Sequence, residues 1–536
     1  DFIMVMTPGG TQVPVKIVGS SIFGRHPIIS DERTWNMFES DQWLINFAGY
    51  EQAVEIISPP LGVEGRGLFH STRGNFLLVV LGSNVYRIYA NLGFEFLFSM
   101  TSQTGEVFMD ENLSSQIAIV DGSSSGYIYN YTTGTIGAID FVNTGGGTVF
   151  TPNYVTYQNT YFIFGNADKT TSGSLWFVYR SGFNPTTLAN PLQLTWVQTL
   201  TLQTKPDFAL ACIRIPSHGN NLLVLGSTVA EIWTNVAGLQ IYQRQSSINI
   251  DYGVASVSTI AASDDIVAWL GINEKSSPAI MVMKGGQAER ISTDGIDYLL
   301  SRVKHPERST AMFYRQDGHV FYILTFFDDL DNFSIMYDFT TQKFFDITDW
   351  DFNYHPARQI AYFNNETYFV SLDQGSLMRL STNLTSISTD IQNDYEIPRI
   401  RKCDTYRLPG SDRFIVNQFS FTIENGVEPD VDFQFECDGY ILGEESHAIM
   451  YSEDGRPLLV EGGSCQIYRP RIDVSISKNG GHTYGNAVPY YMHATGKYKN
   501  QPRFNQLGEA NQFTIQMRFW GFGAVVIANG LLEVRQ

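Results

Sequence analysis

A hairpin pattern that recurs along the chain constrains its fold more than any other feature. Residues 75–91 and 221–235 share an uninterrupted aliphatic run, a turn containing Gly-Ser, and a strand in which apolar and polar residues alternate. The aliphatic run predicts a strand buried on both faces, and glycine supplies the positive φ that a tight turn needs. The returning strand of the second hairpin, with Val229, Ile232 and Trp233, is expected nearer the surface. Two such copies indicate an internal repeat.

Five further units repeat the pairing of an inner apolar strand with an outer one. They join 117–120 to 127–129, 161–164 to 175–179, 266–270 to 279–283, 320–324 to 333–337, and 368–371 to 377–380. The inner strands end at Leu81, Val120, Phe164, Leu225, Leu270, Leu324 and Val370, so successive units lie 39, 44, 61, 45, 54 and 46 residues apart. A period of about 40–50 residues is typical of β-propeller blades. We predict six or seven blades over 66–385, the number depending on whether an N-terminal strand completes the last blade.

Composition supports an all-β fold. Charged residues make up only 17% of the chain, whereas Gly (47), Tyr (28) and Phe (37) are abundant, and no long segment has helical periodicity. Hydrophobic residues at 43% suffice for a packed core. No run approaches the ~18 apolar residues of a membrane-spanning helix, so we predict no membrane span.

Two regions flank the predicted propeller. Residues 1–65 hold short strands broken by Gly and Pro, and we expect them to lead into the propeller and close it, or to join the C-terminal domain. Residues 383–394 are polar without apolar periodicity, as in a linker. The strands expected beyond Pro398 alternate cleanly, which predicts an antiparallel β-sandwich, a platform domain over 386–536. They lie at 414–416, 419–423, 431–435, 472–477 and 513–519.

The charge balance opposes a surface that grips nucleic acid. The chain has 54 acidic and 35 basic residues, a formal net charge of -19, whereas phosphate binding requires clustered Lys and Arg. Such a charge is compatible with a surface past which DNA slides. The four cysteines, Cys212, Cys403, Cys437 and Cys465, lack the spacing of a zinc site or a disulfide framework and are expected to be isolated buried thiols.

No motif predicts an active site, a cofactor or a metal. His355 with Asp349 and Asp351 could form a metal or acid/base set, but a hydrogen-bonded loop histidine is the simpler interpretation. The segment 328–332, Asp-Asp-Leu-Asp-Asn, could offer oxygens to Ca²⁺, yet it is better explained as the solvated tip of a hairpin. The histidines show no ligand spacing, and neither a phosphate-binding glycine loop nor a nucleophile elbow occurs.

One turn near the C-terminus resembles an Asp-box. The segment 477–484 resembles the pattern Ser-x-Asp-x-Gly-x-Thr-Trp, with Asn479 in place of Asp and Tyr484 in place of Trp, and we assign Ser477, Asn479, Gly480, Thr483 and Tyr484 to the turn. We expect a structural turn in which the Asn479 side chain closes the loop on backbone N–H groups and the aromatic ring packs beneath. Sialidases carry this box on propellers, so a β-propeller glycosidase or lectin acting on surface glycans is the alternative. It would need an arginine cluster, an acid and a nucleophile around a pocket on the propeller axis.

A series of short motifs resembles the tail hub proteins of short-tailed bacteriophages, also called nozzle or packaged-DNA-stabilising proteins. The motifs lie at the start of the chain, in the first hairpin and near the C-terminus. They are Thr34–Phe38, Trp43–Tyr50, Val79–Tyr86, Ser477–Tyr484, Gly496–Tyr498, Arg503–Phe504, Leu507–Ala510 and Phe513–Phe519.

The resemblance implies a non-enzymatic structural protein in the virion tail. It implies a propeller plus platform assembled as a homohexameric ring below the portal and adaptor proteins of the connector. The ring would conduct DNA without sequence-specific binding, retain the genome until a needle or plug is released, and anchor tail fibres or tailspikes. Six chains would carry 6 × -19 = -114 charges, and any share facing the bore would repel phosphate. The sequence does not identify the channel-lining residues. A cellular interaction scaffold is a third interpretation, but its repeats would be more alike.

Overall fold

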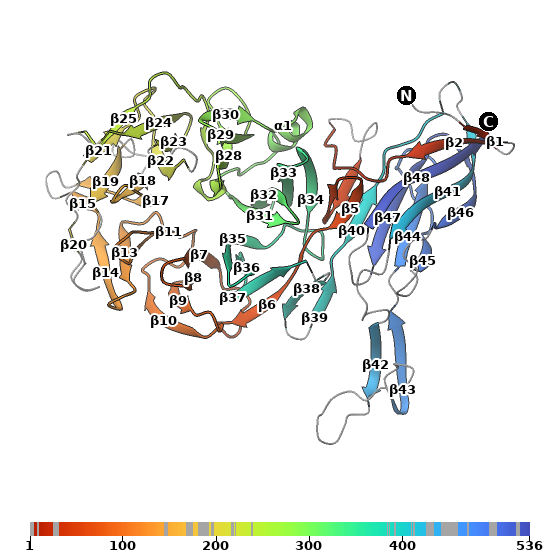
Figure 1. The fold of residues 1–536 in the computed structure, drawn as a ribbon, viewed down its shortest axis with the longest axis horizontal. Helices are drawn as coiled ribbons and strands as arrows, with labels where there is room; N and C mark the ends of the chain where they lie inside the picture. Colours follow the sequence, from red (N-terminus) through yellow and green to blue (C-terminus); the bar gives the residue numbers. More distant parts are fainter. Residues whose placement is uncertain are drawn as a thin grey trace.

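The computed structural model shows a β-propeller joined to a β-sandwich (Figure 1). It describes residues 5–7, 10–24, 32–143, 148–167, 175–180, 192–193, 198–215, 219, 221–236, 240–382, 384, 386–390, 393–408, 410, 413–424, 434–440, 459–468, 471–491, 501–520 and 526–535.

Seven antiparallel sheets follow one another along the chain and surround a common axis. The first three comprise β7 (Gly65–Ser71), β8 (Phe76–Leu81), β9 (Asn84–Ile88) and β10 (Phe94–Ser99); β11 (Phe108–Glu111), β12 (Gln116–Val120), β13 (Ser125–Asn130) and β14 (Thr135–Asp140); and β17 (Pro152–Gln158), β18 (Tyr161–Asn166), β19 (Leu175–Arg180) and β21 (Gln198–Thr201). Short strands β15 (Val142–Asn143) and β16 (Thr148–Val149) pair together, and β20 (Leu192–Gln193) pairs with β14.

The remaining four blades have the same plan. The fourth and fifth comprise β22 (Ala209–Arg214), β23 (Asn221–Gly226), β24 (Ala230–Asn235) and β25 (Tyr242–Arg244); and β26 (Gly253–Val254), β27 (Ala261–Ser263), β28 (Ile266–Ile272), β29 (Ala279–Lys284) and β30 (Gln287–Arg290). The sixth and seventh comprise β31 (Ser309–Gln316), β32 (His319–Phe327), β33 (Asn332–Asp338) and β34 (Lys343–Ile347); and β35 (Ala357–Phe363), β36 (Glu366–Ser371), β37 (Ser376–Ser381) and β6 (Gly49–Glu55).

All seven hairpins expected from the sequence are confirmed by their strand pairing. The first turns at Gly82, whose φ is 55°, between the paired residues Leu81 and Asn84. The seventh blade takes its outer strand from far upstream, because β6 runs antiparallel to β37 with Tyr50 opposite Leu380. The N-terminal strand thereby joins the end of the propeller to its beginning.

Apolar cores lie between adjacent blades, one cluster for each of the seven interfaces. Successive residues of an inner strand serve opposite interfaces: Val267 and Trp269 pack toward the fourth blade, whereas Ile266 and Leu270 pack toward the sixth. Side chains of a strand point alternately to its two faces. A strand between two apolar interfaces therefore needs apolar residues at every position, which explains the uninterrupted runs.

The expectation that residues 229–233 lie nearer the surface is wrong. Val229, Ile232 and Trp233 are 0–1% exposed. Trp233 packs with residues of the third blade and Ile232 with residues of the fifth, so β24 is covered on both faces by neighbouring blades. The acidic residue of this strand is buried too, because Glu231 is 0% exposed, whereas Thr234 and Asn235 at the end of the strand are half-buried.

Two short helical segments connect strands in the described part of the chain. Helix α1 (Asp294–Leu300) follows the fifth blade, begins at the cap Thr293, and buries Ile296 and Leu300 against the core between the fifth and sixth blades. A short 3₁₀ turn, η2 (Val257–Thr259), lies within the fifth blade.

The polar segment interpreted as a linker forms a hairpin instead. Strands β38 (Ser386–Asp390) and β39 (Asn393–Glu396) pair with each other, and β38 runs parallel to β6 at the edge of the seventh blade. Strands at the edge of a sheet can pair without apolar periodicity, so the polar sequence concealed the strands.

The C-terminal sandwich consists of two packed sheets. One contains β1 (Val5–Thr7), β2 (Gly10–Val15), β48 (Val526–Arg535), β41 (Phe414–Glu424) and β46 (Arg503–Ala510), with β5 (Trp43–Asn46) and β4 (Met37–Ser40) beside them. The other contains β40 (Arg399–Lys402), β47 (Thr514–Trp520), β44 (Arg471–Ser477) and β45 (Val488–Tyr491). Phe419 and Val416 from the first sheet and Met517 and Ile472 from the second share one core. The expected strands 414–416 and 419–423 are one bulged strand, β41.

A single sheet of nine strands connects the two bodies. It passes from β34 of the sixth blade through β3 (Arg33–Trp35) to β40 and on into the sandwich. Trp35 is the joining residue, because it pairs with Asp346 on one side and Ile400 on the other. The junction is therefore hydrogen-bonded sheet.

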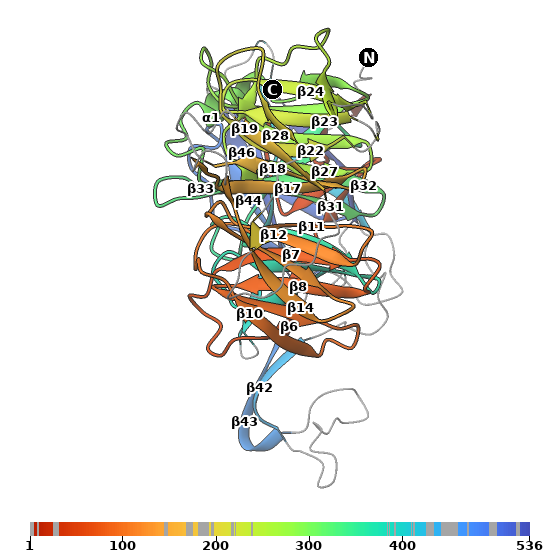
Figure 2. The same cartoon turned by 90° about the vertical axis from the view of Figure 1, so that its left-hand side faces the viewer.

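A two-stranded ribbon projects from the sandwich in both views (Figures 1 and 2). It pairs β42 (Gln434–Tyr440) with β43 (Leu459–Tyr468), and its register sets Cys437 opposite Cys465. The sequence predicts four isolated cysteines, and for this pair the prediction is wrong. Strand pairing places Cys437 opposite Cys465, although the two positions are 28 residues apart in the sequence. Cys212 and Cys403 are free and buried, as expected. Residues 431–433 of the expected 431–435 strand lie outside the described residues.

Candidate functional site

The strands at the axial edge of the blades, each next to the apolar strand called inner above, line a cavity of about 680 Å³ near the propeller axis. Its walls come from β7, β11, β17, β27, β31 and β35, the innermost strands of six blades. The glycosidase alternative requires two carboxyl groups and an arginine cluster at this place.

Glu106 is the one acidic residue among the described residues that line this cavity. Its Oε1 accepts a hydrogen bond of 2.6 Å from Nε2 of Gln359, and burial raises the pKa of its carboxyl group. The one lining arginine, Arg315, already pairs with Asp264. A single carboxyl group cannot act as both acid and nucleophile, so the described lining does not assemble a glycosidase site.

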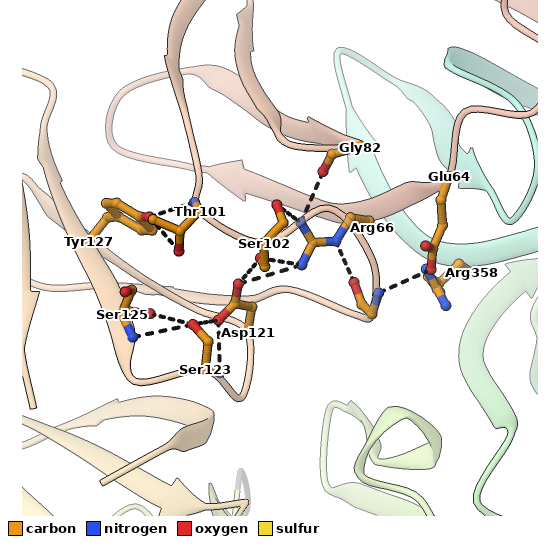
Figure 3. A network of polar contacts seen from close by, with 11 residues as sticks. Glu64, Arg66, Gly82, Thr101, Ser102, Asp121, Ser123, Ser125, Tyr127 and Arg358 are labelled. Carbon is orange, nitrogen blue, oxygen red and sulfur yellow. Dashed lines mark hydrogen bonds and ion pairs between the residues drawn. The ribbon is translucent and has the colours of Figure 1, made fainter. Parts of the chain in front are cut away.

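A buried polar network lies where the first, second and seventh blades meet (Figure 3). Arg66, on β7, is 0% exposed and donates to the carbonyl oxygens of Gly105 (2.6 Å), Gly82 (2.9 Å) and Ser102 (3.0 Å). Its Nη2 also lies 3.5 Å from Oδ2 of Asp121, whose side chain is 1% exposed. One guanidinium group thus fixes the loops of two blades.

A second ion pair joins this network to the seventh blade. Arg358, on β35, pairs with Glu64 and donates to the carbonyl oxygen of Gly65 at 3.1 Å. Because Glu64 also accepts from the backbone N–H of Gly105 at 3.4 Å, the seam between the last and first blades is bridged by charged hydrogen bonds. The arrangement is structural: both arginines are already paired within the chain.

The structure separates the histidine set considered from the sequence. Asp349 Oδ1 accepts the backbone N–H groups of Asp351 (2.9 Å) and Asn353 (2.7 Å) and so closes the loop after β34. His355 is 2% exposed, and its ring centroid lies 5.4 Å from that of Tyr50 and 5.8 Å from that of Phe369. His355 therefore belongs to an aromatic core, and no metal set forms among the described residues.

Burial of His355 gives the protein a specific acid sensitivity. Burial lowers the pKa of His355 to about 3, whereas an unfolded histidine titrates near about 6.5. Between these values the unfolded chain binds one proton more, so lowering the pH should reduce the free energy of unfolding by about 1.4 kcal/mol per pH unit. The part of the unfolding free energy that depends on neutral His355 is fully present above pH ~6.5 and is lost as the pH falls toward ~3.

We expect His355→Phe to flatten the dependence of unfolding free energy on pH between pH ~6 and ~4. Guanidinium unfolding at a series of pH values measures this difference. At pH ~8 both proteins are neutral at this site, so a difference in stability there comes from packing and from the lost hydrogen bond. In that bond the Ala357 N–H donates to Nδ1 of His355 at 3.3 Å. Parallel curves for the two proteins would show that His355 does not titrate differently on unfolding.

The acidic turn 328–332 is held by protein groups. Asp328 Oδ1 accepts from Nη1 of Arg308 at 2.6 Å, and Asp331 Oδ2 accepts from the backbone N–H of Lys304 at 2.6 Å. Hydrogen bonding to Arg308 lowers the pKa of Asp328 against the opposing effect of desolvation. These carboxylates stabilise a hairpin between β32 and β33.

The Asp-box-like turn connects β44 to β45. Asn479 Oδ1 accepts from the backbone N–H of Thr483 at 3.0 Å, and its Nδ2 donates to Thr483 Oγ1 at 2.9 Å. Ser477 Oγ accepts from the N–H of Gly481 at 2.8 Å, and Gly480 adopts a φ of 74°. A Cβ placed on Gly481 would lie 3.4 Å from the Tyr484 hydroxyl oxygen, so that hydroxyl lies against the turn.

Sequence reasoning missed Arg66 and the residues that surround Tyr50. The signal for Arg66 was present as a lone arginine between two glycines in an apolar strand, Gly65-Arg66-Gly67-Leu68. The residues near Tyr50 come from β6, the loop after β34 and the turn after β36. No one-dimensional pattern joins β6 to these two distant segments.

The architecture defines a seven-bladed β-propeller built into one sheet with a β-sandwich. The model of the family described as Bacteriophage P22 Gp10, beta-propeller, matches residues 33–384. The chain belongs to this family, and it is therefore a phage structural protein and a component of the virion. No helix among the described residues is long and apolar enough to cross a membrane.

Two solved structures resemble the chain at low sequence identity. One is titled a streptogramin B lyase structure, with 10% identity, a TM-score of 0.39, and coverage of 64% of this chain and 99% of that chain. Another is a catalytically inactive variant of virginiamycin B lyase from Staphylococcus aureus with quinupristin, with 9% identity, a TM-score of 0.41, and coverage of 62% and 99%. A search of curated proteins finds no match.

Proposed function

We propose that this protein is the hub, or nozzle, of a short phage tail. In this role six copies form a ring below the portal and adaptor proteins, and the ring conducts packaged DNA, retains it until a needle or plug is released, and anchors tail fibres or tailspikes. Membership of the phage family supports a virion role, and the fold supports a mechanical one.

The observation that carries the mechanical role is the nine-stranded sheet. A subunit that sits between a pressurised capsid and external appendages must transmit force without hinging. Strands β34, β3 and β40 join propeller to sandwich through backbone hydrogen bonds, whereas domains linked only by a flexible segment would move independently. The Arg401 side chain reinforces the same junction by donating to the carbonyl oxygens of Ile17 (2.6 Å) and Ser20 (3.1 Å).

The acidic charge of the chain suits a conduit. A ring of six would carry a formal charge of 6 × -19 = -114, and acidic groups that face the bore repel phosphate. DNA would then move without the Lys and Arg contacts that give stable binding. Closing such a ring requires heterologous contacts between neighbouring copies.

Negative-stain electron microscopy of the purified protein, alone and mixed with connector proteins, tests the proposal. We expect sixfold rings with an open bore in at least one of the two samples. Single discs in both would contradict the self-assembling hub. A glycan-binding screen on the same protein tests the lectin alternative, for which the cavity on the propeller axis is the place to expect a ligand.

A further inference from the structure

A second cavity, of about 390 Å³, lies at the edge between the sixth and seventh blades. It forms where the loop after β34 meets the turn between β36 and β37, beside Tyr50 of β6. Asp349, Trp350, Tyr354, Asp373 and Gln374 line it. No role assigned above uses this cavity.

Two carboxylates converge on this cavity. Asp349 and Asp373 both raise the pKa values of Tyr50 and Tyr354, in each case as additions to the larger effect of burial. Asp373 Oδ1 accepts from Ser371 Oγ at 2.7 Å, a neutral donor. The described lining contains no lysine and no arginine. The lining therefore carries negative charge and no cation. Arg358, outside the lining, lowers the pKa of Tyr354 against the two carboxylates, but it is already paired with Glu64.

Gln374 supplies an independent indication of a ligand. It is 6% exposed, and its Oε1 is buried without a hydrogen-bond partner among the described residues. Buried polar atoms are normally satisfied, and an orphaned acceptor costs about 1–3 kcal/mol. Gln374 lies in the same lining as Asp349 and Asp373, so an N–H donor that satisfies this oxygen would enter a cavity that also holds both carboxylates.

We propose that this cavity binds an organic cation, an alkyl ammonium or guanidinium group. Trp350, 40% exposed, and the rings of Tyr50 and Tyr354 provide aromatic walls, which favour such cations. A bare metal ion would leave a cavity of about 390 Å³ largely unfilled. The cation can come from a basic side chain of a partner protein or from a free polyamine. The proposal does not depend on the hub role.

Isothermal titration calorimetry of the full chain tests this assignment with small probes. We expect n-butylguanidinium or n-butylammonium, mimics of Arg and Lys side chains, to bind saturably and n-butanol not to bind. Tighter binding of spermidine than of n-butylammonium would identify a polyamine as the source, and equal or weaker binding would identify a side chain. Equal binding of n-butanol, or tighter binding of Ca²⁺, would overturn the assignment.

Two variants are expected to change binding in opposite directions, and misfolding could not strengthen binding. Asp373→Asn retains the Oδ1 acceptor of Ser371 but removes the charge, and we expect about tenfold weaker binding or more. Gln374→Glu adds a carboxylate beside the orphaned position and should strengthen binding. Asp329→Asn, in the exposed turn after β32 and outside the cavity, is the matched control. The proposal fails if Asp373→Asn and Gln374→Glu both bind as this control does.

Discussion

Replacing Arg401 with methionine should lower the free energy of unfolding by about 3 kcal/mol and loosen the junction between propeller and sandwich. Arg401 is 0% exposed, pairs with Glu32, and donates to Ile17 O at 2.6 Å and Thr34 Oγ1 at 2.9 Å. Methionine removes these donors and leaves the buried Glu32 carboxylate. Because Lys16 Nζ lies 3.5 Å from that carboxylate and remains, we place the loss at the lower end of the usual range of about 3–5 kcal/mol.

Guanidinium unfolding measures this loss, and limited proteolysis reports on the junction. Arg413→Met is the matched control, because the Arg413–Glu509 pair of the sandwich has side chains 72% and 56% exposed. Exposed pairs contribute about 0–1 kcal/mol. Adding Glu32→Gln to Arg401→Met should recover part of the loss, since it removes the stranded charge. Equal losses for Arg401→Met and Arg413→Met would contradict this account.

Replacing Arg66 with methionine should destabilise the propeller by about 3–5 kcal/mol. The change removes the donors to three backbone carbonyl groups and leaves Asp121 buried without its guanidinium partner. Asp121 retains hydrogen bonds from Ser123 Oγ (2.6 Å) and the Ser123 N–H (3.0 Å). These neutral donors do not replace a charged partner in a buried site.

Thermal unfolding with a matched arginine tests whether burial is the cause. Arg73 also spans the first two blades, through a hydrogen bond from Nη1 to the carbonyl oxygen of Leu113, but that bond is exposed. Arg73→Met should therefore change the unfolding temperature little. A similar decrease for both variants would show that bridging between blades, rather than the buried charge, determines the stability.

Both arginines show how a structural virion protein can carry charge in its interior. Each guanidinium group lies at a seam, Arg66 between blades and Arg401 between domains. At these seams, loops leave carbonyl groups that no strand satisfies. An arginine presents five donors in a fixed fork and can satisfy several of them at once. The same property fixes how the two sides of each seam fit together, because moving either side would leave a buried charge without its partner.

The candidate sites were less predictable than the fold. The hydrogen bonds within the Asp-box-like turn connect residues no more than four positions apart, from Ser477 to Thr483, so a local motif was sufficient to propose it. His355 and Asp349 were grouped because they are close in sequence. In the structure His355 packs in an aromatic core, whereas Asp349 accepts backbone hydrogen bonds within its loop. The cavity beside Tyr50 had no local signature at all.

The sequence by itself determined the repeat, the all-β class and the seven hairpins, because each hairpin depends on residues close in the chain. The uninterrupted apolar runs also determined that inner strands are covered on both faces. Only the tertiary structure decided that β6 closes the seventh blade, that residues 386–396 extend that blade, and that Trp35 joins two domains in one sheet. Strand pairing uses backbone N–H and C=O groups, which are the same in every residue except proline, so the sequence does not record which distant strand a given edge will meet.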